Sequence, residues 1–313
     1  MADAQRLSVK WTKGSSLDWF LLIVLAVIWG SSYVLIKKSI QTYEPVQVAQ
    51  LRMILSGVFL LPFLPRVFKR VPRSKLLTII VVGVVGSAIP AFLYPFAQQK
   101  IDSAVMGIIN STVPLFTFSI GVVFFHVVFN KVKALGILIG LSGALVLVFL
   151  KSDGSFSSDF GYALIGLAAT LCYGLSTNLI KSKLNEVDPL ALTSAIYIIT
   201  GFICLISALP WTNIIVEQSV SEPIGFLYIS LLALFGTAIA MILFNRLVQR
   251  TDALFAATVT YLMPLVSIFW GVLDGESLGL LSFLGMILIL LGVFVTNRLG
   301  YQNQPSKKNG NLE

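Results

Sequence analysis

The chain has 313 residues, of which 57% are hydrophobic and only 12% are charged, and its mean hydropathy is +0.90. Soluble domains carry about 25% charged residues, so this chain lacks the charge needed to cover a water-facing surface. A soluble globular enzyme is therefore excluded. Ten apolar helices of about 20 residues each, joined by short connections, account for the whole length. The composition predicts an all-α membrane protein.

Ten continuous apolar windows follow one another along the chain, separated by short polar or charged connections. They are longer than the alternating strands of about 10 residues that build membrane barrels, so each window is predicted to be a helix. A polar tail at 1–17 precedes them, and a tail at 299–313 without apolar periodicity is predicted to be disordered. The windows lie at residues 18–36, 45–64, 76–97, 103–126, 132–150, 160–180, 189–210, 224–246, 253–273 and 278–298.

The net charge of +8, from 22 basic and 14 acidic residues, indicates topology and not a nucleic-acid partner. With ten spans and a cytoplasmic N-terminus, 17 of the 22 basic residues lie in cytoplasmic segments and 4 in external ones, while Arg52 lies within a span. Basic residues collect on the cytoplasmic side of membrane proteins. We therefore expect both termini in the cytoplasm and, given the short loops, a multi-pass protein of a bacterial inner membrane.

An internal repeat relates the two halves of the chain. At an offset of 150 residues, segments 86–121 and 236–271 share nine identities in 36 positions, including Pro114 with Pro264. At an offset of 144, Trp29 pairs with Tyr173. Each half, at 18–150 and 160–298, then holds five helices. Because five is odd, equivalent loops lie on opposite sides of the membrane, which is the inverted repeat typical of alternating-access transporters.

Four segments resemble the EamA type of the drug/metabolite transporter superfamily, over nearly all of residues 18–298. They are WGSSYVLIKKSI, the arginine in QLRMILSG, LYPFAQQKIDSAVMGIINSTVPLFT and TDALFAATVTYLMPLVSIFWGVLDGESLG. The resemblance implies two five-helix halves and the export or exchange of small metabolites, such as amino acids, through a cavity between them. It also implies a structural or gating role for the Gly-Glu pair that ends the proline-containing helix.

The chain departs from the family pattern at two places. Gly275 and Glu276 supply the Gly-Glu pair in the second half, but Phe125 and His126 stand at the same distance from the proline in the first half. The third helix ends in Gln98-Gln99, where small or apolar residues are commoner in the family, and this points to a role in substrate choice.

Arg52 is the most costly polar residue within a span. Polar side chains in a bilayer tend to face a partner helix or an aqueous cavity. Two interpretations stay open for Arg52: it binds a carboxylate or phosphate group of the substrate, or it is a structural arginine that snorkels outward or bonds to a backbone carbonyl. The structural interpretation has the greater weight at this point, because the family resemblance places arginine here across many substrates.

The prolines of the fourth and ninth helices mark a second group of candidates. Pro114 and Pro264 each free a backbone carbonyl, which neighbouring hydroxyl groups can bond, and this gives the polar residues before them a structural explanation. Alternatively these residues line a central substrate site. Aromatic residues in the middle of spans likewise serve packing more often than binding. The cavity candidates are Trp29, Ser32, Arg52, Tyr94, Gln98, Asn110, Tyr173, Asn178, Tyr197, Thr260 and Tyr261.

Glycines spaced seven residues apart mark the fifth and tenth helices. Gly136 and Gly143, with Gly285 and Gly292, form small-residue stripes that suit helix packing or a dimer face, so the chain is expected to be a monomer or a homodimer. His126, the single histidine, lies at a predicted membrane edge, where an interfacial side chain is a simpler explanation than a proton switch.

No Asp or Glu lies in the middle of a predicted span. Proton-coupled transporters commonly use buried carboxylates, so facilitated export or exchange is favoured. An enzyme would need buried aspartates, a metal-ligand helix or a Ser–His dyad, so we expect neither catalysis nor a metal or cofactor. The expected partners are a small-molecule substrate and the lipid bilayer. A multidrug exporter stays open as an alternative, and a membrane receptor or assembly protein is disfavoured by the repeat.

Overall fold

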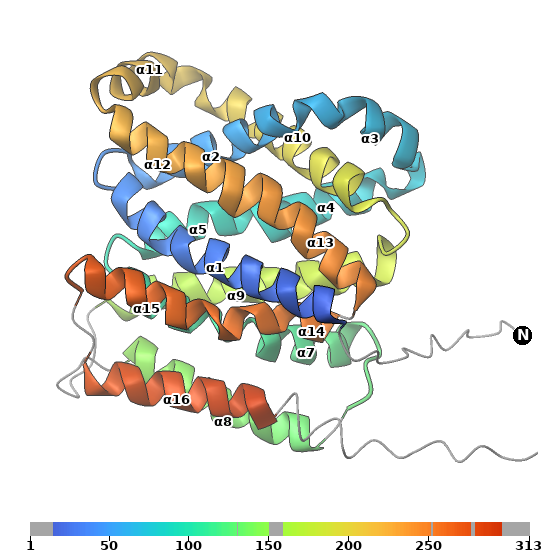
Figure 1. The fold of residues 1–313 in the computed structure, drawn as a ribbon, viewed down its shortest axis with the longest axis vertical. Coiled ribbons are helices and arrows are strands. Elements are labelled where there is room, and N and C mark those ends of the chain that lie inside the picture. The colour runs from blue at the N-terminus through green and yellow to red at the C-terminus, as the bar shows by residue number, and fades with distance from the viewer. Residues whose placement is uncertain (1–14, 130, 150–158, 252, 277–278, 296–313) are drawn as a thin grey trace, which may run out of the picture.

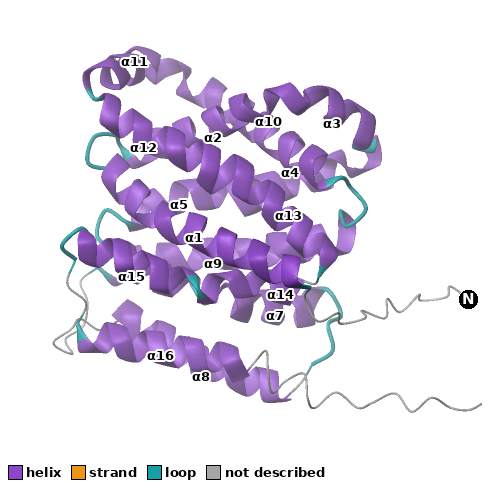
Figure 2. Cartoon of the chain, in the orientation of Figure 1, coloured by secondary structure: helices purple, strands orange, loops and turns teal. Residues whose placement is uncertain are grey.

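The computed structural model describes residues 15–129, 131–149, 159–251, 253–276 and 279–295. These residues form helices joined by turns and short loops, and no strand occurs among them (Figure 2). The all-helical class predicted from composition is therefore confirmed. The tail at 299–313 lies outside the described residues, as does most of the tail at 1–17.

The first half of the chain forms helices at each of its five apolar windows. Their ends follow local chemistry: the Ser15 hydroxyl accepts from the backbone N–H of Asp18 at the start of α1, and Pro45 stands in the first turn of α2. The elements are α1 (Ser16–Ser39), α2 (Pro45–Leu60), η1 (Leu61–Phe63), α3 (Leu64–Arg70), η2 (Arg73–Lys75), α4 (Leu76–Gly83), η3 (Val84–Ala88), α5 (Ile89–Ala97), α6 (Ser103–Asn110), α7 (Val113–Phe124) and α8 (Lys131–Phe149).

The second half follows the same order of elements. Asp188 caps α10 by accepting from the backbone N–H of Ala191. The elements are α9 (Phe160–Lys183), α10 (Pro189–Ala208), η4 (Leu209–Trp211), α11 (Thr212–Ser221), α12 (Pro223–Ala233), η5 (Leu234–Ile239), α13 (Ala240–Arg250), α14 (Ala253–Ala257), η6 (Thr258–Tyr261), α15 (Met263–Leu273) and α16 (Leu280–Phe294).

Eight helical segments in the described part of the chain are long and apolar enough to cross a membrane. They run over Ser16–Ser39, Pro45–Arg70, Arg73–Ala97, Ser103–Phe124, Phe160–Lys183, Pro189–Ser221, Pro223–Arg250 and Phe255–Leu273. The other two expected spans, 132–150 and 278–298, coincide with α8 and α16. Within α16 the apolar stretch Leu280–Gly292 is shorter than a full span.

Elements from the two halves interleave in the bundle. α1 lies between α15 on one side and α12 and α13 on the other, while α2 packs against α10 (Figure 1). α8 and α16 run side by side along one edge. Every large interface therefore joins helices distant in sequence, and the apolar cluster around Leu25, Met106 and Ile196 spans both halves.

Glycines allow the closest helix contacts, and they do so in pairs that the repeat relates. A Cβ atom on Gly57 of α2 would lie 2.8 Å from the Tyr197 carbonyl oxygen, and one on Gly201 of α10 would lie 2.8 Å from the Met53 oxygen. The stripes on the fifth and tenth windows behave likewise: Gly143 faces Gly285 across the α8–α16 contact, and Gly292 faces Gly136 and Gly140. These glycines are therefore used in packing within the chain.

Two short π-helical segments interrupt the helical spans Arg73–Ala97 of the first half and Pro223–Arg250 of the second half at equivalent places. η3 (Val84–Ala88) and η5 (Leu234–Ile239) begin 150 residues apart, which is the offset of the sequence repeat. A π-helix widens a turn and leaves backbone groups for other partners, and such segments often lie at functional sites. Nothing in the residue pattern of these apolar stretches predicts them.

We expect Gly57→Ala to lower the free energy of unfolding by about 1–3 kcal/mol, because the added methyl group pushes on the α10 backbone. Thermal unfolding in detergent measures the change. Gly161→Ala is the control, since no atom lies within 4 Å of a Cβ built there. Equal stability of Gly57→Ala and Gly161→Ala would contradict the close α2–α10 contact.

Candidate functional site

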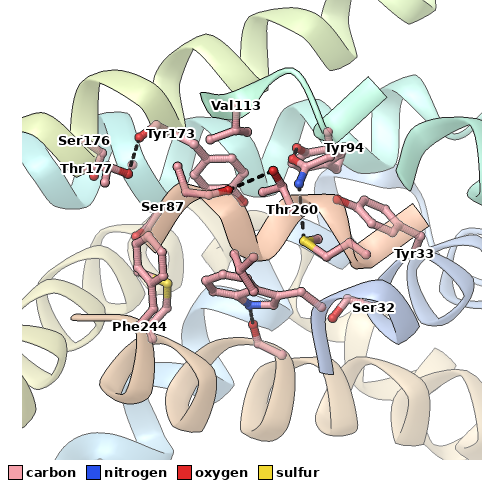
Figure 3. A pocket seen from close by; sticks show the side chains of 18 of the residues that line it. Ser32, Tyr33, Ser87, Tyr94, Val113, Tyr173, Ser176, Thr177, Phe244 and Thr260 are labelled. Carbon is pink, nitrogen blue, oxygen red and sulfur yellow. Dashed lines mark hydrogen bonds between the residues drawn. The ribbon is translucent and has the colours of Figure 1, made fainter. Parts of the chain in front are cut away.

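A cavity of about 70 Å³ lies in the middle of the bundle, and residues from both halves of the chain line it (Figure 3). Small-molecule sites usually measure about 300–1,000 Å³, so this cavity is smaller than a typical site. Its wall combines aromatic rings with hydroxyl groups, one amide and one guanidinium. A molecule larger than a few atoms enters only if the surrounding helices separate.

Two helical faces with the same spacing form opposite parts of the wall. α1 contributes Trp29, Ser32, Tyr33 and Ile36, and α9 contributes Tyr173, Ser176, Thr177 and Ile180. Each set follows the i, i+3, i+4, i+7 spacing of one helix face, and the offset of 144 maps one set onto the other. The first helix of each half therefore plays the same part in the cavity.

Hydrogen bonds and ring contacts hold the aromatic wall in place. The indole N–H of Trp29 donates to the Gly236 carbonyl in η5 at 2.9 Å, and the Tyr94 hydroxyl donates to the Asn110 side-chain oxygen. The ring centroids of Tyr33 and Tyr94 lie 5.8 Å apart, and those of Tyr94 and Tyr173 lie 6.0 Å apart. The rings thus present a connected, oriented surface to the cavity.

The Asn110 amide nitrogen has an unusually weak partner. It donates to the Met263 sulfur at 3.6 Å, and a thioether is a poor acceptor. Both residues line the cavity. The amide is therefore held in orientation by Tyr94 while its N–H groups can bond to a polar group placed in the cavity.

Arg52 is 8% exposed and lines the cavity from α2. Its Nε–H donates to the Thr237 hydroxyl of η5 at 2.8 Å. That hydroxyl in turn donates to the Leu232 carbonyl at 3.1 Å, so the π-helical segment positions the guanidinium. The bond to Thr237 fits a structural role and the place in the cavity wall fits a binding role, so both interpretations of Arg52 stay open.

The prolines explain why polar groups reach the cavity from the fourth and ninth windows. α6 ends at Asn110 and α7 begins at Val113 with Pro114 in its first turn, and Pro264 occupies the same position in α15. Pro264 removes the N–H that would bond the Thr260 carbonyl. The Ser111 hydroxyl donates to that carbonyl at 2.9 Å, so part of the structural explanation holds for this site.

The structure brings most of the predicted cavity residues together. Tyr33, Ser87, Ser176, Thr177 and Phe244 were not predicted, although the helical spacing from Trp29 and Tyr173 would have found three of them. The predicted residues that line the cavity are Trp29, Ser32, Arg52, Tyr94, Asn110, Tyr173, Tyr197 and Thr260.

Three residues predicted for the cavity lie elsewhere. Asn178 donates to the backbone carbonyls of Thr117 and Gly174, so its amide serves helix packing. Gln98 donates to the Tyr33 carbonyl and lines a separate vestibule of about 460 Å³ at the end of α5. Tyr261 belongs to η6 and is not among the cavity-lining residues.

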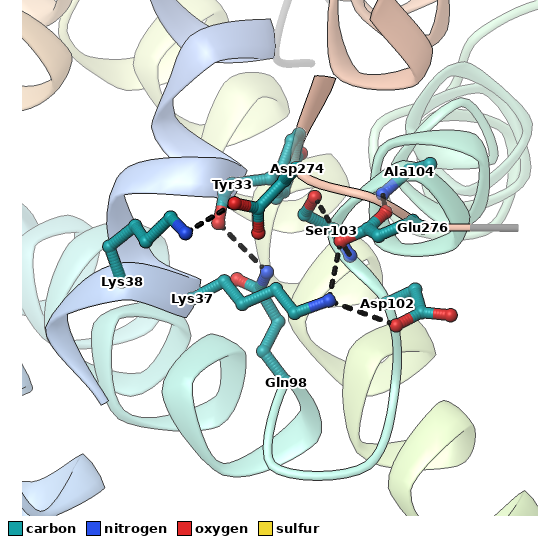
Figure 4. A network of polar contacts seen from close by, with 9 residues as sticks. All are labelled: Tyr33, Lys37, Lys38, Gln98, Asp102, Ser103, Ala104, Asp274 and Glu276. Carbon is teal, nitrogen blue, oxygen red and sulfur yellow. Dashed lines mark hydrogen bonds and ion pairs between the residues drawn. The ribbon is translucent and has the colours of Figure 1, made fainter. Parts of the chain in front are cut away.

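Glu276 accepts hydrogen bonds from four donors of the other half, beyond the end of α15 (Figure 4). The amine of Lys37 lies 2.7 Å from its carboxylate, and the hydroxyl and backbone N–H of Ser103 and the backbone N–H of Ala104 bond to it at 2.6–2.9 Å. The Glu276 side chain is 2% exposed. Asp102 also pairs with Lys37 at 3.0 Å. We call this network the Glu276 contact.

Gly275 places the glutamate by ending α15 in the left-handed conformation, with φ of 82°. The N–H of Glu276 bonds to the Gly271 carbonyl at 2.9 Å and that of Gly275 to the Val272 carbonyl at 3.1 Å. This is the Schellman arrangement in which glycine is preferred. Directly before it, Asp274 pairs with Lys38.

The equivalent turn of the first half differs, and it corrects the pairing of His126 with Glu276. There the left-handed residue is His126, with φ of 56°. The helix runs one residue further, because the N–H of Phe125 still bonds to Gly121. His126 therefore corresponds to Gly275. Val127 follows it and faces Gly121, as Glu276 faces Gly271.

Two further ion pairs join other elements of the bundle, and their arginine sides are more exposed than Lys37, although the Asp18 side chain is only 7% exposed. Arg250 pairs with Asp18 at 2.7 Å, and Arg66 pairs with Asp188 at 2.8 Å, and both arginine side chains are at least 39% exposed. Exposed pairs contribute about 0–1 kcal/mol each. Lys181, the counterpart of Lys37, donates to the backbone carbonyls of Val248, Gln249 and Thr251.

The sequence profile of the EamA-like transporter family matches residues 18–149 and again residues 160–298. The chain belongs to the EamA-like transporter family. Together with the apolar spans, this makes it a multi-pass protein of the inner membrane. The family and its named relatives are transporters and not enzymes.

Three relatives and one solved structure illustrate the likeness. The "Uncharacterized inner membrane transporter YedA" of Escherichia coli (strain K12) is 27% identical over 91% of this chain and 92% of its own. An S-adenosylmethionine/S-adenosylhomocysteine transporter of Chlamydia trachomatis serovar L2 is 28% identical over 86% of each chain. A probable amino-acid metabolite efflux pump of Salmonella typhimurium is 25% identical over 91% and 96%. A protein of known crystal structure shares the fold, with a TM-score of 0.64, 17% identity and coverage of 92% and 99%.

Glu276 gives this EamA-family protein a testable dependence on pH. Burial alone raises the pKa of its carboxyl, but the bonds from Lys37, Ser103 and Ala104 outweigh burial and hold the pKa below its usual value of 4.5. A carboxylate with a lowered pKa stabilises the fold above its unfolded-state pKa, and the stabilisation is lost as the pH falls through the folded-state pKa.

We expect Glu276→Gln to lower the free energy of unfolding by about 1–3 kcal/mol at pH 7, because a buried charge-assisted network is lost. The deficit relative to the unaltered protein stays constant from pH 8 to about pH 5.5 and shrinks under stronger acid. Thermal unfolding in detergent at each pH measures it. Glu222→Gln, at an exposed position, is the control. A deficit that shrinks between pH 8 and 6 would show that Glu276 is not a stably ionised partner.

Proposed function

We propose that this protein exports or exchanges small metabolites, amino acids or related compounds, across the inner membrane by alternating access. The observation that carries the proposal is the cavity itself. Residues of two halves that each match the family profile line it, and different ion pairs join the bundle at Glu276 and at Asp18.

Alternating access needs two halves that rock around one fixed site. The paired faces of α1 and α9, the paired π-helical segments and the Gly57–Gly201 contact all support a duplicated five-helix unit. The proposed arrangement has ten spans in two inverted repeats, 18–150 and 160–298. The distribution of basic residues supports cytoplasmic termini, so the Glu276 contact lies at the external end.

Amino acids or related metabolites are the proposed cargo for two reasons. The relatives include an amino-acid metabolite efflux pump and a transporter of S-adenosylmethionine, which is itself an amino-acid derivative. The cavity wall also offers hydrogen-bond donors, which a purely hydrophobic drug would leave unpaired. A multidrug exporter is the second candidate, supported by the connected rings of Tyr33, Tyr94 and Tyr173.

The decisive test compares extracellular and intracellular metabolites in a deletion strain and in a strain that overproduces the protein. We expect overproduction to raise the external level of a small set of related metabolites and deletion to lower it. Overproduction of Gly161→Ala serves as the matched positive control, because its Cβ meets no neighbour. No change in any metabolite, with increased tolerance to unrelated toxic compounds, would instead support the multidrug exporter.

The mode of coupling is tested with the metabolite so identified. No carboxylate lines the described cavity, so the proposed binding site itself offers no acidic group to carry a proton. In proteoliposomes we expect equal initial rates with and without a pH gradient. Strict dependence on the gradient would contradict facilitated export.

A further inference from the structure

The Arg52 guanidinium is a buried cation for which the described residues provide no anion. It carries five N–H groups, and its recorded bond is the one from Nε to the Thr237 hydroxyl. No ion pair of Arg52 occurs among the described residues, and neither aspartate nor glutamate lines the cavity there. The remaining N–H groups belong to the two terminal nitrogens of the guanidinium. Together these nitrogens can bind a carboxylate or a phosphate in a bidentate manner.

An unpaired charge is costly inside a membrane protein, and the chain can avoid that cost by using an apolar residue. It does so at the equivalent position of the second half, where the offset of 144 residues pairs Arg52 with Ile196. Ile196 is 1% exposed and belongs to the apolar core. The equivalent place in the other half is therefore filled by an apolar residue, so the repeated architecture does not by itself require an arginine.

We propose that Arg52 binds the single anionic group of the substrate, a carboxylate or a phosphate, and so restricts the cargo to small organic anions and zwitterions. The proposal rests on the proposed transport function and specifies the substrate class of the same cavity. Asn110 is a second donor for that group, because its amide N–H faces only the Met263 sulfur. The Tyr33, Tyr94 and Tyr173 rings then contact the rest of the molecule.

The charge of the substrate follows from the charge of the cavity wall. One cation and no described carboxylate in the wall give the site one unit of positive charge to neutralise. A second negative charge would be left uncompensated in a low-dielectric site, so among phosphates a singly charged diester fits better than a monoester, which carries close to two charges at pH 7. A cation would meet electrostatic repulsion. A cationic group elsewhere on a zwitterion is accommodated by the ring faces, which attract ammonium groups.

The test determines the chemical class of the compounds that the protein moves. In the metabolite comparison, we expect every compound exported by the unaltered protein to carry a carboxylate or a phosphate group. For one such compound, reconstituted protein should transport the acid at least about 10-fold faster than its uncharged amide or ester. Finding only carboxylates or only phosphates identifies which of the two anions the site takes.

Substitutions separate binding from a structural role. Arg52→Gln should bring the ratio of acid to amide transport close to one, whereas Arg52→Lys, which keeps a point charge, should retain a reduced preference for the acid. Arg73→Gln, which removes an exposed arginine outside the cavity and outside these ion pairs, should leave the ratio unchanged. Membrane abundance is measured for each variant.

Two results would overturn the proposal while transport itself stands. The first is export of compounds without an acidic group. The second is an acid preference that persists in Arg52→Gln. If Arg52→Gln does not accumulate, the acid-to-amide ratio of the unaltered protein and of Arg52→Lys still decides the question. Absence of any transport by the unaltered protein would instead refute the proposed function.

Discussion

A carboxylate that is almost removed from solvent must be surrounded by donors, and Glu276 obtains all of its recorded donors from the other half of the chain. This constraint joins the end of α15 to α1 and to the start of α6. The Schellman turn at Gly275 ends α15 and so places the Glu276 carboxylate in this contact. It is also the contact that a carrier has to break if the cavity is to open there.

The ion pairs that join the bundle differ in kind. Away from Glu276, the ion pairs Arg250–Asp18 and Arg66–Asp188 have half-exposed arginines, although Asp18 is only 7% exposed, and Val127 stands where the pseudo-symmetry places Glu276 in the other half. Breaking exposed pairs costs little free energy, whereas separating a buried pair costs several kcal/mol. If the protein works by alternating access as proposed, unequal contacts of this kind would favour one resting state.

The pseudo-symmetry of the fold explains the cavity, and its violations explain the proposed selectivity. The α1 and α9 faces repeat each other, as do the π-helical segments and the glycine contacts. Arg52 has no such counterpart, since Ile196 stands in its place. A duplicated unit supplies the geometry for alternating access, and the residues that differ between the units are where substrate recognition is added.

The sequence predicted the class of fold and much of the cavity, because long apolar runs and polar residues within them are easy to recognise. Apolar length predicted the helices, and the cost of polar groups in lipid pointed to Arg52, Asn110 and Thr260. The sequence did not reveal which apolar residues of a helix face the protein core and which face outward. In α1, Leu22 is 1% exposed and Phe20 is 61% exposed, yet both are apolar, because lipid and protein core select the same side chains.

Amide side chains were the least predictable part of the site. Asn178 and Gln98 are as polar as Asn110, but their amides bond to backbone carbonyls of neighbouring helices. Sequence does not reveal which carbonyls lie free, since that depends on how helices end and where π-helical turns occur. The one-residue difference between the turns at His126 and Gly275 was hidden for the same reason: equal spacing in sequence concealed a longer helix.

Alternating access is the central claim, and paired distance measurements test it most directly. Spin labels at positions 99 and 222 report the Glu276 end, and labels at positions 69 and 183 report the opposite end, after replacement of Cys172 and Cys204. Double electron–electron resonance would measure both distances in the cysteine-replaced protein with Glu276 and in the same protein with Glu276→Gln. The account predicts that the first distance lengthens while the second shortens. Distances that stay constant, or that lengthen together, would contradict it.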